Sequence, residues 1–111
     1  MQGESEEAAV EAFAITVDRR DELTAYVRIV GEVDLPRTDE VDATFDRLIE
    51  AGVRRFYIDG SGIRFMDSMG LRSLLRLVRS GAGLDVVIQS PSPPVRRILQ
   101  ATGVDQVVTM E

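Results

Sequence analysis

An adjacent aspartate and serine, Asp67 and Ser68, are the residues whose types and setting point most directly to chemistry. Both types are common at the start of a helix, because their oxygens accept hydrogen bonds from backbone N–H groups that lack a partner within the helix. A serine hydroxyl can also carry a phosphate, which adds about −1.5 to −2 charges at neutral pH. The pair is therefore either a structural helix cap or a modifiable group at a helix start.

Apolar and basic side chains surround this pair. Phe65, Met66 and Met69 place bulky apolar groups on both sides of it. Four polar residues then follow the expected helix at i, i+4, i+8 and i+11, namely Ser68, Arg72, Arg76 and Arg79. This line runs beside the apolar stripe that should face the core, so we expect it to face solvent. It is either a solvated basic face or a docking face that begins at Ser68.

The composition excludes several kinds of catalytic site. The chain has no histidine and no cysteine, so Ser-His-Asp and Cys-His arrangements and zinc sites built from these ligands cannot form. Asp34, Asp59 and Asp67 could meet at the carboxyl ends of strands and hold Mg²⁺, but caps and turns account for them better. A phospho-aspartate receiver with Asp59 as acceptor would need a lysine, which the chain lacks. We expect no enzyme activity, no metal and no cofactor.

Length and charge bound the remaining classes. The 111 residues suit one domain, which we place at residues 13–111, after a flexible acidic tail at residues 1–12. The net charge of −6 disfavours binding to nucleic acid. No apolar run approaches the ~20 residues that span a bilayer, and the acidic start does not match a secretory signal. We expect a cytoplasmic protein that binds neither nucleic acid nor membrane, and leave its oligomeric state open.

Hydrophobic patterning predicts alternating strands and helices. Strands are predicted at residues 13–17, 23–30, 54–59, 84–88 and 104–109. Helices are predicted from Pro36 to a stop at Gly52, from Ser68 to a stop at Gly81 or Gly83, and from Pro94 to a stop at Gly103. We expect residues 31–36 to break the second strand and residues 60–62 to form a flexible connection.

The order β-β-α-β-α-β-α-β indicates an α/β fold. The first two strands should form a hairpin, and the helical crossovers should place the later strands in parallel, so the sheet is expected to be mixed. Leu84–Ile88 is a nearly continuous apolar run, which is typical of a strand covered on both faces.

Three stretches, in order along the chain, resemble the signature of STAS domains, and in particular that of bacterial anti-sigma-factor antagonists. Asp59–Leu71 is similar to that family's Asp-Leu-Ser-Gly-Val-x-Phe-Met/Ile-Asp-Ser-Ser/Thr/Ala-Gly-Leu. Val30–Asp34 resembles its Gly-Glu-Leu/Val-Asp after the second strand. Ser90–Val104 resembles its Ser-Pro-x-Val-x-Arg-x-Leu-x-x-x-Gly. The resemblance covers residues 13–111 and implies the STAS fold, a mixed β-sheet with flanking helices.

The resemblance also implies a mechanism. Such proteins bind an anti-sigma factor that is a serine kinase, and so release a sigma factor in stress response or sporulation. The kinase phosphorylates the serine after the motif aspartate, here Ser68, and the phosphorylated form no longer holds the kinase until a serine phosphatase restores it. With the docking interpretation, this gives an expected partner-binding set of Asp34, Phe65, Met66, Asp67, Met69, Gly70, Arg72 and Arg76.

An alternative stays open within the same family, a STAS subunit of a transport or stress-signalling complex that is not phosphorylated. Two positions depart from the family pattern. Gly60 replaces a leucine and is expected to loosen the end of the third strand, and Met69 replaces a small residue and is expected to affect partner choice or kinase access. Because helix starts favour anions and Arg72 lies one turn on, we expect phosphorylation to leave the fold intact and to act on binding.

Overall fold

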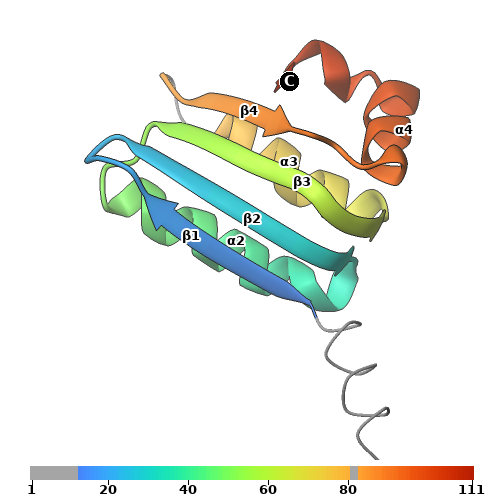
Figure 1. Cartoon of the computed structure of the whole chain (residues 1–111), viewed down its shortest axis with the longest axis horizontal. Helices are drawn as coiled ribbons and strands as arrows, with labels where there is room; N and C mark the ends of the chain where they lie inside the picture. Colours follow the sequence, from blue (N-terminus) through green and yellow to red (C-terminus); the bar gives the residue numbers. More distant parts are fainter. Residues whose placement is uncertain (1–12, 81–82) are drawn as a thin grey trace, which may run out of the picture.

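The computed structural model describes residues 13–80 and 83–111. This part of the chain forms a five-stranded sheet in the order β1-β2-β3-β4-β5 (Figure 1). The strands are β1 (Ala14–Arg19), β2 (Thr24–Val33), β3 (Arg55–Met66), β4 (Asp85–Gln89) and β5 (Thr109–Met110). β1 and β2 pair antiparallel, and every later pair is parallel. The predicted element order and mixed sheet are confirmed.

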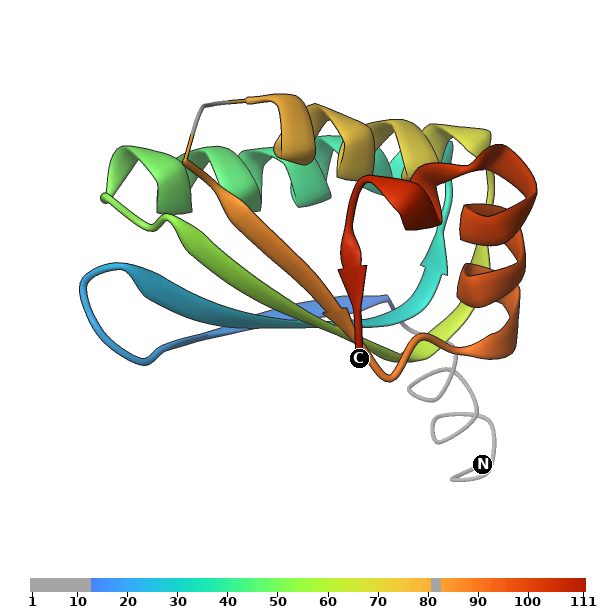
Figure 2. The same cartoon turned by 90° about the horizontal axis from the view of Figure 1, so that it is seen from above.

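Helices connect the parallel strands. They are α2 (Leu35–Glu50), α3 (Ser68–Arg79) and α4 (Pro93–Thr102), followed by a short 3₁₀ helix, η1 (Val104–Gln106). Figure 2 shows α2 and α3 side by side on one face of the sheet, with α4 at its end. No helix in the described ranges is long and apolar enough to cross a membrane. The acidic residues 1–12 lie outside the described residues.

The core lies between the sheet and these helices. Val27, Phe56 and Ile88 point from neighbouring strands into it and are buried. Phe45 of α2 meets Phe56 edge to face, with ring centroids 5.7 Å apart. Leu99 of α4 is fully buried at the end of the sheet. Alternation along each strand therefore directs one set of side chains inward, as expected for a sheet with one packed face.

The other face of the sheet is open. Tyr26 and Tyr57 stack on it with ring centroids 4.6 Å apart, and no helix among the described residues covers them (Figure 2). The prediction that Leu84–Ile88 is covered on both faces is therefore wrong. Val86 is buried and Val87 only partly so, because they point to opposite faces of β4.

The segment 60–62 continues β3 and is not a flexible connection. β2 and β3 pair at Arg28–Asp59 and next at Val30–Gly62, so β3 holds one extra residue between these pairs. A second register shift follows at Gly31–Glu32. β-bulges of this kind bend a strand without ending it. Gly60, Ser61 and Gly62 therefore mark a bulge within β3. Because the bulge does not end the strand, β3 continues to Met66.

The ends of two other strands also differ from prediction. β2 does not break at Gly31, whose φ is 106°, but continues to Val33. The strand predicted at residues 104–109 is instead η1 followed by a turn. Of these six residues, only Thr109 belongs to β5. Val104 and Val108 are both buried, because the 3₁₀ turn directs both side chains into the core. The prediction of a longer strand rested on their apolar character alone.

We predict that Gly60→Ala raises the free energy of unfolding by about 0.5 kcal/mol, by restricting the unfolded chain. A Cβ at Gly60 would meet nothing closer than the Cα of Pro91, at 3.5 Å. Urea denaturation followed by circular dichroism measures the change. Gly62→Ala is the matched comparison, since its Cβ would lie 3.0 Å from Val30. A Gly60→Ala protein no more stable than Gly62→Ala would contradict the prediction.

Candidate functional site

The start of α3 is held by a side-chain cap. Asp67 precedes the helix with an extended backbone, and its Oδ1 accepts hydrogen bonds from the N–H groups of Met69 (2.9 Å) and Gly70 (3.0 Å). Asp67 is therefore the N-cap that its residue type indicated. Ser68 is the first helical residue and is exposed. The cap thus fixes the helix while the neighbouring hydroxyl faces solvent.

Gly70 allows the first turn of α3 to rest directly on the end of β2. A Cβ at this position would lie 2.4 Å from the carbonyl oxygen of Val33 and 2.9 Å from its Cγ1. The backbone N–H of Asp67 donates to the same carbonyl, at 3.3 Å. A side chain at position 70 would force the helix away from the strand. Glycine therefore sets how closely the site approaches the sheet.

This contact places the starts of α2 and α3 at the same edge of the sheet. Val33 ends β2 and pairs with Met66 of β3, so the residues that follow each strand begin from neighbouring points. Asp34 occupies the N-cap position of α2 and is partly buried, but its side chain makes no capping hydrogen bond. The structure thus brings Asp34 to the same edge as Asp67 and Ser68.

Exposed apolar side chains flank this edge. Phe65 is 47% exposed and Leu35, the first residue of α2, is 59% exposed. Met66 and Met69 are half-buried. Sequence reasoning identified the residues near Ser68 but missed Leu35. The available signal was that Leu35 falls outside the inward-facing stripe of its helix.

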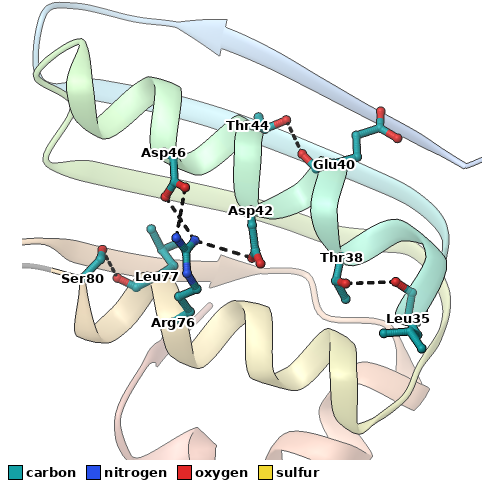
Figure 3. A network of polar contacts seen from close by, with 9 residues as sticks. All are labelled: Leu35, Thr38, Glu40, Asp42, Thr44, Asp46, Arg76, Leu77 and Ser80. Carbon is teal, nitrogen blue, oxygen red and sulfur yellow. Dashed lines mark hydrogen bonds and ion pairs between the residues drawn. The ribbon is translucent and has the colours of Figure 1, made fainter.

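The basic line along α3 is partly built into the fold. Its members are all exposed, as predicted, but the guanidinium of Arg76 donates two hydrogen bonds to Asp46 of α2, at 3.1 and 3.0 Å. It also lies 3.8 Å from Asp42 (Figure 3). The hydrogen bonds and charge of Asp46, with a smaller contribution from the charge of Asp42, raise the pKa of Arg76 above its usual value. Arg76 therefore ties α3 to α2.

A groove of 550 Å³ lies between α2 and α3. Its apolar lining includes Leu35, Met69 and Leu75, its basic lining includes Arg72 and Arg79, and Asp39 and Asp42 of α2 also line it. Within residues 13–80 and 83–111, neither the Arg72 nor the Arg79 guanidinium has a hydrogen-bonding or ionic partner. Along α3 the groove runs from Met69, the residue after Ser68, to Arg79.

The aspartates considered for metal or phosphoryl chemistry do not form one site. Asp59 accepts hydrogen bonds from the N–H and hydroxyl of Ser61, at 2.9 and 2.7 Å, and lies 3.8 Å from Arg28. The Ser61 N–H, with smaller contributions from its hydroxyl and from Arg28, lowers the pKa of Asp59. Asp67 is engaged as a cap. The described residues contain no group of three acidic side chains that could hold a metal ion.

Comparison with known families decides the identity of the domain. A sequence model of the STAS domain matches residues 14–111. The chain belongs to the STAS domain family. The family resemblance that the three motifs suggested is thereby confirmed, and their central segment forms the start of α3. Comparison with curated proteins gives no match.

The STAS domain is similar in fold to solved structures of anti-sigma factor antagonists. One from Mycobacterium paratuberculosis has a TM-score of 0.81 and 21% identity, over 90% of this chain and 86% of that one. Unphosphorylated SpoIIAA has a TM-score of 0.74 and 25% identity, over 88% of each chain. Phosphorylated SpoIIAA from Bacillus has a TM-score of 0.68 and 22% identity, over 88% of this chain and 91% of that one.

Gly70→Ala should lower the free energy of unfolding by about 1–3 kcal/mol. The added methyl group meets the Val33 carbonyl, a backbone atom that cannot rotate away, and this clash outweighs the higher helix propensity of alanine. Urea denaturation of Gly70→Ala and of Arg72→Ala, an exposed position in the same helix, provides the comparison. If both variants match the wild-type STAS domain, the contact does not constrain α3.

Asp67→Ala should lower the free energy of unfolding by about 1 kcal/mol, because two N–H groups lose their acceptor. Asp67→Asn keeps an oxygen at the same place and should lose clearly less. Thermal unfolding of the two variants separates hydrogen bonding from charge. Equal losses would show that the negative charge on the helix start, and not the acceptor geometry, accounts for the effect.

Proposed function

We propose that this STAS domain protein is an anti-sigma-factor antagonist of the bacterial cytoplasm. It binds an anti-sigma factor that is also a serine kinase and so releases a sigma factor. Phosphorylation of Ser68 ends the binding, and a serine phosphatase restores it. The observation that carries the proposal is the exposed hydroxyl of Ser68 at the start of α3, directly after the capping Asp67. SpoIIAA, which has a similar fold, was solved in both phosphorylated and unphosphorylated forms.

The surroundings of Ser68 suit a docking surface. The exposed side chains of Phe65 and Leu35 supply apolar area that can be buried against a partner. Asp34 and Arg72 add polar groups around this area. A kinase docked here would meet the serine hydroxyl without having to unfold α3, because Asp67 and not Ser68 caps the helix.

A phosphate on Ser68 should leave the fold intact. The N–H groups of Met69 and Gly70 already donate to Asp67, so no helix hydrogen bond has to change. Arg72, one turn further on, is exposed and available for an i, i+4 ion pair with the phosphate. The modification therefore acts on the surface, where it adds negative charge to a protein that already carries −6.

The same phosphate should oppose docking. A partner that buries Phe65 must also remove water from the dianion beside it, and the neighbouring Asp67 adds a like charge. A loss of ~3 kcal/mol in binding free energy would weaken the complex more than a hundredfold. The switch is thus electrostatic and requires no conformational change in the antagonist.

The proposal predicts that Ser68 is the phosphorylated residue. Incubation with an anti-sigma kinase from the same organism and with ATP, followed by intact-mass analysis and peptide mapping, should show one added phosphate in the wild-type protein and none in Ser68→Ala. Ser80→Ala is the matched control, because Ser80 is exposed directly after the end of the same helix. Full labelling of Ser68→Ala would assign the site elsewhere.

Binding to the same kinase completes the test. Ser68→Ala should bind like the wild type, and Ser68→Asp should bind at least about tenfold more weakly in calorimetry. If Ser68→Asp binds as tightly as the wild type and protein isolated from its own cell carries no phosphate, the switch is refuted. The STAS domain would then serve as an unphosphorylated subunit of a larger complex.

A further inference from the structure

We propose that the groove between α2 and α3 holds an acidic helical segment of the protein partner. Two of its carboxylates, about two turns apart, would pair with Arg72 and Arg79, and an apolar side chain between them would pack on Leu75. This assignment rests on the proposed function in that the partner is the anti-sigma factor. Its chemistry, however, is set by the groove alone.

Arg72 and Arg79 differ from most described arginines in lacking a side-chain partner. Arg20 pairs with Asp18, Arg28 with Asp59, Arg55 with Asp85, and Arg76 with Asp42 and Asp46. Arg96 and Arg97 of α4 also lack a side-chain partner among the described residues, but they do not line the groove. The chain has 19 acidic residues for 13 basic ones, so a lack of carboxylates does not explain why Arg72 and Arg79 have no partner among the described residues. Both line the groove and both are exposed.

The spacing of the two arginines matches that of side chains on a helix. Arg72 and Arg79 are seven positions apart on one helix face, which corresponds to about 10 Å along the axis. A helix lying in the groove presents side chains at i and i+7 over the same distance, both on one face. Carboxylates at these two positions complement the two guanidinium groups, as required for charge recognition across an interface.

Between Arg72 and Arg79, the groove is lined by a neutralised arginine and by apolar side chains. Arg76 lies between the two free cations, but its guanidinium is already bonded to Asp46 and close to Asp42, as Figure 3 shows. It therefore attracts a third carboxylate less than its neighbours do. Leu75, Met69 and Leu35 supply apolar surface. Along α3 the groove thus presents a cation, a neutralised bridge and a cation beside an apolar wall, which favours an amphipathic acidic helix. Asp39 and Asp42 line the α2 side, so the carboxylates of the bound helix must face α3.

This arrangement also links the groove to Ser68. Arg72 follows Ser68 by four positions, so a phosphate there can pair with it within the helix. Phosphorylation would then both repel an acidic segment and occupy one of the two arginines that bind it. The negative switch and the acidic partner are therefore consistent with one another.

The test uses the full chain and a fluorescent helical peptide of about 16 residues, long enough to cover α3. The peptide carries two glutamates seven positions apart with a leucine midway, and a reference peptide carries glutamine instead of glutamate. Anisotropy is measured at low ionic strength, about 0.02 M, because salt screens exposed charges. The wild-type chain should prefer the glutamate peptide by about fivefold or more.

The double variant Arg72→Gln, Arg79→Gln should lose this preference. The variant Arg96→Gln, Arg97→Gln removes the same charge from exposed positions of α4 and should keep it. The proposal is overturned if the wild-type chain shows no preference, including the case in which neither peptide binds, or if the groove variant retains it. A preference that appears only after glutamine replaces Glu4, Glu6, Glu7 and Glu11 would assign the groove to this chain's own first residues and would also overturn it.

Calorimetry with the anti-sigma factor separates this inference from the proposed function. If the wild-type chain binds the factor and the groove variant binds it equally well, the groove assignment fails while the function stands. If the peptide preference holds but the factor does not bind, the function fails while the chemistry of the groove stands. Weaker binding by the groove variant alone, with the α4 variant unchanged, supports both.

Discussion

The organisation of this STAS domain depends on one close contact, the first turn of α3 against the last carbonyl of β2. Gly70 makes the contact possible because a Cβ would lie 2.4 Å from the Val33 oxygen. The Asp67 N–H donates to that same oxygen. Since α2 begins immediately after Val33, a single backbone carbonyl fixes the relative position of two helix starts. The exposed edge around Ser68 and the entrance of the groove follow from this arrangement.

The strand β3, which leads into the start of α3, is fixed by hydrogen bonds from the start of α4. β3 bends at its bulges after Asp59, and bent strands need partners to fix their course. The hydroxyl of Ser92, at the start of α4, donates to the Ile63 carbonyl, and the Ser92 N–H donates to the Gly60 carbonyl. α4 therefore supports the bent half of β3, and through it the position of Asp67, without contributing a side chain to the site.

Much of this domain could be predicted from local patterns. The strand and helix order, and a helix cap at Asp67 or Ser68, follow from periodicity and from residue types within a few positions of one another; the structure assigns the cap to Asp67. What could not be predicted depends on residues far apart in the chain. Arg76 donates to Asp46, which lies thirty positions earlier in the chain. The helical pattern alone cannot distinguish Arg76 from Arg72 and Arg79, which have no such partner among the described residues.

The bulged segment shows a different limit. Glycine and serine at positions 60–62 favour a turn, a loop or a bulge by the same conformational freedom. Only the pairing partner decides among these, and that partner, β2, lies about thirty residues earlier. The wrong prediction of a flexible connection therefore reflects a property of glycine, and the correct outcome required knowledge of the sheet.

The division of roles between Asp67 and Ser68 separates the helix cap from the site of the proposed phosphorylation. If the serine hydroxyl capped α3, a phosphate ester would replace the capping group and change the stability of the helix with every cycle. Here the carboxylate carries the capping hydrogen bonds, and the serine extends from the first turn into solvent. In the proposed switch, stability and regulation depend on adjacent but different side chains, so that adding or removing charge at Ser68 would leave the contact between α3 and β2 unchanged.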